Sequence, residues 1–351
     1  MKKIAAFLFV TLFFAGLSVA GPPIDLTDME RLGRHLYKDK NLSFNGTQSC
    51  QVCHHPFAGF EDRRNALNPE TSVVSIGADG VSKGGRNAPT AAYAGYSPAL
   101  SIVNNEWVGG MFWDGRADGS VLGDPLAEQA QGPPLNPVEM AMPDKAIVIN
   151  VIADSFYADL FQSVFGQDAF DDNNVDAAYD NFGRAIAAYE RSSEVTAFSS
   201  KYDLNPNQFT TAEGSGQELF ETHCAICHSN KAAFGSQSAL FTNYQYANIG
   251  VPENPLVLLT VPDLGLGATV GDVYQEGKFK VPTLRNIAAS PPYTHNGYFA
   301  SLRDMVAFIN DSSAYVPEIK GNIADEVGSM GLSDDDIDDL VAFLLTLTDG
   351  Y

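Results

Sequence analysis

The fold of this chain is decided by two short stretches of sequence, Cys50-Gln51-Val52-Cys53-His54 and Cys224-Ala225-Ile226-Cys227-His228. They share the pattern C-x-x-C-H and start 174 positions apart. The chain has 351 residues and four cysteines, and these two stretches hold all four. Four cysteines in an exported protein usually suggest disulfides, but here none is left over to form one.

Each stretch is typical of a covalent attachment site for haem. Two thiols at this spacing can add across the two vinyl groups of one haem, and the next histidine then lies beneath the iron as its proximal ligand. A bare C-x-x-C could be a redox pair or half of a zinc site, but neither explains a histidine at the next position twice. We therefore predict two c-type haems. Their attachment and ligand residues are Cys50, Cys53, His54, Cys224, Cys227 and His228.

The first residues have the pattern of an export signal. A basic start, MKK, precedes an apolar run over residues 4–19, and small residues lead up to Gly21. This order predicts a signal peptide, residues 1–20, that is cleaved after Ala20. The alternative is a membrane anchor, but the run is rather short for a spanning helix and no comparable run follows. We expect a soluble, periplasmic mature protein without a membrane span.

The formal net charge of the chain is -22. This charge argues against nucleic acid as a partner, because phosphates require lysine and arginine. It argues equally against an anionic membrane surface, and a basic or neutral protein partner is easier to accommodate. Solubility alone would explain the charge just as well.

The first half is predicted to be a helical domain with long, ordered loops. Helices are expected over 26–41, about 144–165 and 174–195. Residues 56–145 are rich in glycine and proline, which indicates extended loops around a cofactor.

The second half repeats the order of helix and then haem motif. Residues 199–210 are a polar linker, and Thr210 begins a capping-box pattern for a helix that leads into the second motif. Ser333 caps a last helix with an acidic first turn. We predict a mainly α protein of two cytochrome c-like domains, residues 21–198 and 211–351, with the haems near their interface.

Five further blocks carry a family resemblance. They are GRNAPT at 85–90, FWDGRA at 112–117, NPVEM at 136–140, FKVPTLRN at 279–286 and YTHNG at 293–297. Each block alone is modest evidence. In this order, and together with both haem motifs, they resemble the bacterial di-haem cytochrome c peroxidase and MauG family over nearly the whole mature chain.

The resemblance implies that peroxide reacts at the N-terminal haem while the C-terminal haem relays electrons. Glu139 matches the family's acid/base residue, which O–O cleavage needs because a proton must move between the two oxygens. Gln129 matches a polar residue of the distal pocket, and Trp113 matches an aromatic residue between the haems. Without the resemblance these three would be interpreted as a surface glutamate, a loop amide and a core tryptophan.

The resemblance also implies one calcium ion between the haems. Asn87 would bind it through a side-chain oxygen, and Ser290 and Pro292 through backbone carbonyls, which are ligands that calcium prefers. His295 matches a pocket residue near the second haem that is not an axial ligand.

The first departure from the family lies in the loop before residues 85–90. Members that need reductive activation carry a distal histidine there, and this chain has Ala78. Because alanine cannot ligate iron, we expect the N-terminal haem to be five-coordinate or water-bound when oxidised, as in MauG-like members.

The second departure concerns the sixth ligand of the C-terminal haem. The family position for a methionine or tyrosine holds Ile309, which has no donor atom. Met305 lies one helical turn earlier and has a soft thioether, although core packing explains it equally well. Met330, Tyr293, Tyr315 or a vacant position are the alternatives.

Three functions are compatible with these residues. The first is reduction of hydrogen peroxide with electrons from a small periplasmic cytochrome or copper protein. The second is MauG-like oxidation of residues or of a bound metal on a partner protein. The third is a non-enzymatic electron carrier, against which the acid/base group Glu139 argues. We expect a peroxide-using di-haem oxidoreductase, and the resemblance also admits a homodimer.

Overall fold

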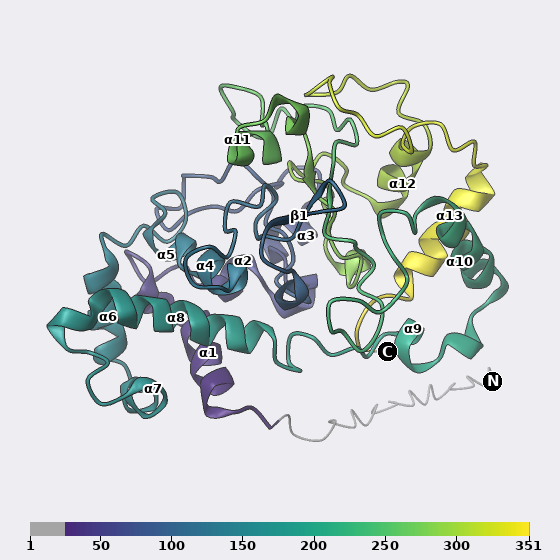
Figure 1. The fold of residues 1–351 in the computed structure, drawn as a ribbon. Coiled ribbons are helices and arrows are strands. Elements are labelled where there is room, and N and C mark those ends of the chain that lie inside the picture. Colours follow the sequence, from purple (N-terminus) through teal and green to yellow (C-terminus); the bar gives the residue numbers. More distant parts are fainter. Residues whose placement is uncertain (1–24, 351) are drawn as a thin grey trace, which may run out of the picture.

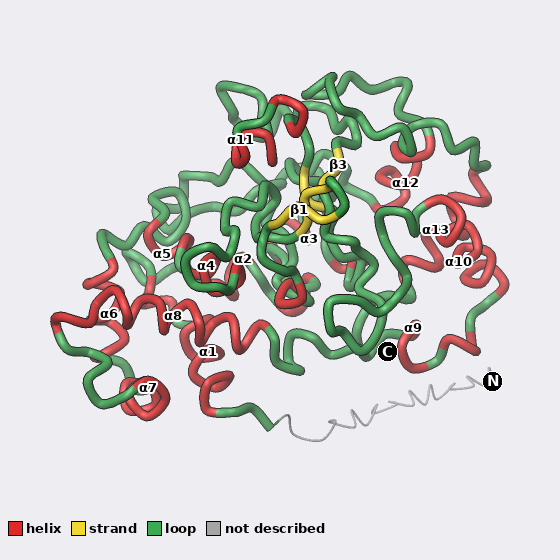
Figure 2. Tube along the Cα trace, viewed as in Figure 1, coloured by secondary structure: helices red, strands yellow, loops and turns green. Residues whose placement is uncertain are grey.

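The computed structural model describes residues 25–350, so the expected signal peptide lies outside the described residues. Helices gather at the two ends of the molecule, with α1, α6, α7 and α8 at one end and α10, α12 and α13 at the other (Figure 1). Long loops fill the region between these helices (Figure 2). The long loops predicted around the cofactors are therefore confirmed, and strands are few and short.

The N-terminal domain is built on the pair α1 (Asp28–Lys38) and α8 (Val175–Glu190). The predicted start of the first helix is confirmed, since the Thr27 hydroxyl accepts a hydrogen bond from the Glu30 amide and the Glu30 carboxylate accepts from the Thr27 amide. The helices cross at Gly33, where any Cβ would collide with the backbone carbonyl of Ala185. Glycine is therefore needed for the backbones to approach this closely.

The two main helices of the C-terminal domain also cross at a glycine. Helices α10 (Thr211–His223) and α13 (Asp334–Leu345) both begin with a capping box; the sequence predicted the box for α10 and, for α13, the Ser333 cap alone. They cross at Gly216, where a Cβ would collide with the backbone oxygen of Asp339. In each domain the haem motif thus follows the helix that contains this glycine, which is α1 in the first domain and α10 in the second.

The helix expected over about 144–165 is wrong as a single element. It consists of α6 (Lys145–Ala153) and α7 (Ala158–Phe165), at an angle of 108° to each other. The break coincides with Ser155, whose hydroxyl donates to the Ile152 carbonyl oxygen at 2.7 Å and competes with the helical bond. The 199–210 linker is also more ordered than expected, because it contains α9 (Lys201–Leu204).

The remaining helices and strands are short pieces within the loops. Strand β1 pairs antiparallel with β2, and β3 pairs antiparallel with β4. In chain order these elements are α2 (Cys50–Cys53), α3 (Arg63–Leu67), β1 (Ser101–Val103), β2 (Glu106–Val108), α4 (Pro125–Ala130), α5 (Gly132–Leu135), β3 (Tyr246–Ala247), α11 (Leu266–Val270), β4 (Phe279–Lys280) and α12 (Leu302–Asn310).

Buried polar contacts join the two domains. Arg285 is almost fully buried and makes two hydrogen bonds to the Asp203 carboxylate, at 2.8 and 2.9 Å, while its guanidinium lies 4.9 Å from the centre of the Tyr93 ring. The Tyr93 hydroxyl donates to Asp349 near the C-terminal end, at 2.8 Å. The chain end therefore returns to the domain boundary (Figure 1).

Among residues 25–350, no single helix is long and apolar enough to cross a membrane. The bent pair α6 and α7 meets the length and composition criteria only when its two helices are taken together.

Candidate haem sites

A cavity of about 590 Å³ adjoins the first C-x-x-C-H motif. Cys50, Cys53 and His54 line it. The Nδ1 atom of His54 lies 3.2 Å from the Phe60 carbonyl oxygen, and burial lowers the pKa of His54. A neutral imidazole with Nδ1 bonded to a carbonyl keeps Nε2 free for a metal, which is the usual arrangement of a metal-ligating histidine.

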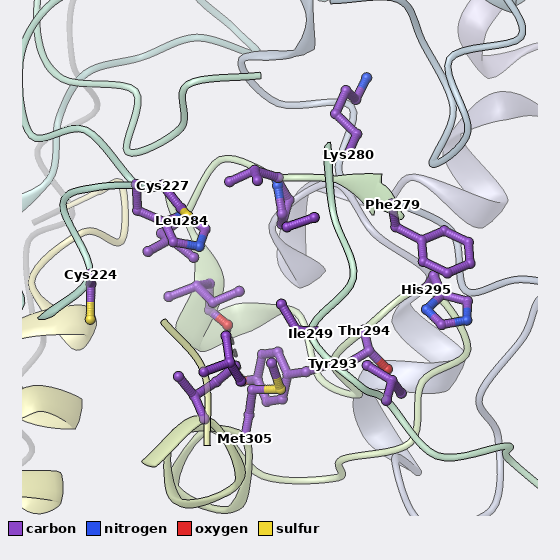
Figure 3. Close-up of a pocket in the computed structure, with 18 of the residues that line it drawn as sticks. Cys224, Cys227, Ile249, Phe279, Lys280, Leu284, Tyr293, Thr294, His295 and Met305 are labelled. Atoms are coloured by element: carbon purple, nitrogen blue, oxygen red, sulfur yellow. Dashed lines mark hydrogen bonds between the residues drawn. The ribbon is translucent and has the colours of Figure 1, made fainter. Parts of the chain in front are cut away.

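A second cavity, of about 240 Å³, adjoins the second motif and has a mostly apolar lining. Its histidine repeats the arrangement of the first site, since His228 Nδ1 lies 2.8 Å from the Phe241 carbonyl oxygen and burial lowers its pKa. Figure 3 shows the cysteines of this motif on one side of the cavity and Met305 on another.

The cysteines fit covalent haem attachment. None of the four forms a disulfide. Burial raises the pKa of Cys53 and of Cys224 to about 12, so both remain neutral thiols. Each cavity therefore presents two free thiols and one neutral imidazole on an apolar wall, which are the groups that a c-type haem requires.

The structure brings Glu139 and Gln129 to the first cavity. Gln129 comes from α4, and Glu139 from the loop after α5. The Asn136 side-chain amide donates to Glu139 Oε1 at 2.8 Å. Burial raises the pKa of Glu139, and the charge of Arg116 and the Asn136 hydrogen bond oppose this shift only in part.

Backbone hydrogen bonds hold the loop at Ala78, the position where the sequence has no histidine. Its amide donates to the Glu139 carbonyl oxygen at 2.6 Å, and its own carbonyl accepts from Asn45 Nδ2 at 2.6 Å. Within the described part of the chain, His54 is the one histidine that lines the first cavity. The lining therefore offers no second imidazole to the iron.

Trp113 lines both cavities. Its indole Nε1 donates to the Asn87 carbonyl oxygen at 2.9 Å, and its own carbonyl accepts from the Lys280 amide at 2.9 Å. The first bond ties the ring to a loop of the N-terminal domain, and the second ties the Trp113 backbone to strand β4.

The candidate sixth ligands of the second haem do not all reach its cavity. Ile309 lines it, as do Met305, Met330 and Tyr293. Tyr293 already donates its hydroxyl to the Ile287 carbonyl oxygen at 3.1 Å. Tyr315 is absent from the lining and packs against Phe308 instead, with ring centres 5.1 Å apart.

Asn87, Ser290 and Pro292 are all buried and all line the second cavity. The sequence analysis missed Glu61, which lines the same cavity and lies in hydrogen-bonding contact with Ser290. No motif marked Glu61, because only the folded chain brings it to residues more than 200 positions away.

His295 is a buried residue of the second cavity, as predicted. It stacks on Phe279, with ring centres 3.5 Å apart and an angle of 9° between the planes (Figure 3). Its Nε2 atom lies 3.6 Å from a Glu318 oxygen and has no hydrogen-bond partner. Glu318 carried no signal in the sequence.

Two helical domains, each with a histidine and two thiols on a cavity, define a di-haem c-type oxidoreductase. The chain belongs to the di-haem cytochrome c peroxidase family. The sequence profile of that family matches residues 27–208, and a cytochrome c profile matches residues 214–348.

Both a MauG protein and cytochrome c peroxidases are similar to this chain over most of its length. The methylamine utilization protein MauG of Paracoccus denitrificans is 39% identical, over 95% of this chain and 92% of its own length. The cytochrome c551 peroxidase of Pseudomonas aeruginosa is 30% identical, over 93% of this chain and 80% of its own. The crystal structure of the diheme peroxidase BthA from Burkholderia thailandensis superposes with a TM-score of 0.81 at 28% identity, over 93% of this chain and 87% of its own.

Proposed function

We propose that this protein reduces hydrogen peroxide at the haem held by His54, with electrons that arrive through the haem held by His228. One observation carries the proposal. The Glu139 carboxyl, held by Asn136, lines the His54 cavity, and no second histidine of the described residues does so.

The overall reaction consumes one hydrogen peroxide, two electrons and two protons and releases two waters. The bound haems would supply an open iron for the peroxide and a store for the electrons. Glu139 would accept the proton of the oxygen nearer the iron and return it to the farther one. Gln129 would hydrogen-bond the peroxide and hold it for this transfer.

Trp113 is proposed to connect the two haems. Trp113 lines both cavities, and one hydrogen bond of its indole and one of its backbone carbonyl hold it there. A large aromatic ring in that position shortens the gap that electrons cross.

We propose Met305 as the sixth ligand of the second haem. Its thioether belongs to helix α12, one turn before Ile309, and Figure 3 shows it directed into the cavity. A soft sulfur is a suitable iron ligand. Tyr293 is less suitable because its hydroxyl is already bonded to a backbone carbonyl.

A calcium ion between the haems is proposed from Asn87, Ser290 and Pro292. They supply one amide and two carbonyl oxygens from two loops that are buried together. Hard oxygen donors of this kind suit calcium, which prefers six to eight of them, so water would complete the shell.

The export signal and the domain division remain proposals. The acidic composition and residues 1–20 favour a periplasmic protein that meets a small cytochrome, a copper protein or a protein substrate there, as a monomer or a homodimer. The boundary at 199–210 is supported by the two profiles, which end at residue 208 and begin at residue 214.

A second candidate function is MauG-like oxidation of a partner protein. Ala78 favours it, because an open iron accepts peroxide without prior reduction. The 39% identity to a MauG also favours it. A plain electron carrier is disfavoured, since a carrier needs no acid/base group.

The deciding experiment adds hydrogen peroxide to the purified di-ferric protein while optical spectra are recorded. Rapid oxidation of added reduced cytochrome c supports the peroxidase. A long-lived, doubly oxidised state with slow cytochrome oxidation supports the MauG-like function. Absence of any reaction would exclude both and leave the carrier.

A further inference from the structure

A side cavity of about 330 Å³ opens beside the His54 site. One buried water needs about 10–15 Å³ of such space, so there is room for several small molecules. Five residues line both this cavity and the haem cavity, and Glu139 is one of them. The full shared set is Phe112, Arg116, Pro133, Asn136 and Glu139.

The haem would fill the larger cavity, so peroxide needs another approach to Glu139. The side cavity reaches the surface, because Val121 in its lining is 81% exposed. Its outer turn is rigid, since the Glu128 carboxylate accepts hydrogen bonds from the Gly119 and Leu122 amides at 2.8 and 2.7 Å. The passage is therefore part of the folded structure.

Arg116 and Phe112 form the wall between the two cavities. The Arg116 guanidinium lies 3.6 Å from the centre of the Phe112 ring, and its Nη1 atom donates to both oxygens of Asp114, at 3.0 and 2.9 Å. Stacking and two hydrogen bonds hold the cation flat against the ring, although its side chain is 48% exposed. The wall that the two cavities share is therefore held in place by contacts of the folded chain.

We propose that this side cavity is the entry route by which hydrogen peroxide and other small neutral molecules reach Glu139. The inference rests on the proposed function. A neutral peroxide can exchange its water contacts for polar groups of the lining such as Gln131 and Asn136, whereas an anion would lose far more hydration.

The test narrows the route in the full-length holoprotein. Gly132 lines only the side cavity, and a Cβ there would lie 3.5 Å from Phe112 Cζ, an ordinary van der Waals contact. The Gly132→Leu variant should lower the second-order rate constants of the ferric protein with hydrogen peroxide and with neutral hydrogen cyanide by about tenfold or more. The first-order step at saturating peroxide should stay unchanged, because the chemistry is untouched.

Two further variants keep the result interpretable. Val121→Trp narrows the exposed rim without disturbing a core and should act in the same direction. Gly214→Leu, on α10, has no atom within 4 Å of the added Cβ and should react like the wild type. Wild-type rates in both Gly132→Leu and Val121→Trp would overturn the route and place entry elsewhere, for example beside Leu259 of the haem cavity. If peroxide does not react with the wild type, the proposed function fails and the cyanide rates alone decide the route.

Discussion

The backbone amide of Ala78 donates a hydrogen bond of 2.6 Å to the carbonyl oxygen of Glu139. The loop that carries a distal histidine in reductively activated relatives is here tied to the residue proposed for proton transfer. Asn45 and Thr47 hold the Ala78 carbonyl from the other side, at 2.6 and 3.1 Å. The loop thus fixes the backbone at Glu139, the residue proposed as the acid/base group, and among the described residues it brings no second histidine to the cavity.

Glu139→Gln should slow the reaction of the ferric protein with peroxide by about 10²–10⁴-fold, the usual contribution of a general acid/base. The amide keeps the size of the side chain but cannot accept the proton. Stopped-flow mixing measures the effect. Glu106→Gln, the same change at an exposed residue of β2 that lines neither cavity, serves as a control and should leave the rate unchanged.

The wild-type rate should depend on pH through Glu139. Proton acceptance requires the carboxylate, and burial raises the pKa of this group above its usual 4.5. As the pH falls through that raised pKa, the carboxylate is protonated and the rate should drop, while it should be constant above it. A pH profile that keeps this acidic limb in Glu139→Gln would assign the titration to another group.

Met305→Leu should change the spectrum of the second haem and abolish the thioether-to-iron charge-transfer band. Leucine fills nearly the same volume but has no donor atom. Met330→Leu, in the lining of the same cavity, is the matched control and should leave the spectrum unchanged. An unaltered spectrum in Met305→Leu would exclude this ligand.

Trp113→Phe should slow electron transfer from the second haem to the first. The smaller ring spans less of the gap and loses the hydrogen bond to the Asn87 carbonyl. Pulsed reduction of the second haem followed by absorbance changes at the first measures this rate. Trp107→Phe, in strand β2, replaces the other tryptophan of the chain and should have no effect.

Arg285→Met should destabilise the folded protein by about 3–5 kcal/mol, because it leaves the Asp203 carboxylate partly buried without its partner. Denaturant unfolding of the holoprotein measures the loss. Arg303→Met removes an exposed arginine with two carboxylate partners and should change stability little. Equal losses of stability in the two variants would show that burial of the Arg285–Asp203 pair does not increase its contribution to the free energy of unfolding.

Gly216→Ala should cost about 1–3 kcal/mol, because the added methyl group pushes α10 away from the Asp339 backbone. Gly214→Ala lies two residues earlier in the same helix, meets no neighbour, and should stabilise by roughly 0.5–1 kcal/mol through helix propensity. Unfolding midpoints of the two variants should therefore move in opposite directions.

The sequence by itself determined which groups can bind haem and where the main helices begin. Cys-x-x-Cys-His is local chemistry, and capping boxes such as those at Thr27 and Thr210 depend on residues three positions apart. Such short-range patterns are readable without a structure, and so was the absence of a donor atom at Ala78 and Ile309.

Only the tertiary structure decided what stands around those groups. Glu61 contacts Ser290, and Glu318 contacts both His295 and Asp263. These residues lie in loops whose sequence has no periodic pattern. The exclusion of Tyr315 from the second cavity depends likewise on packing, because its ring lies against Phe308. The physical reason is that a cavity is formed by side chains from distant segments, whereas the sequence shows only neighbours along the chain.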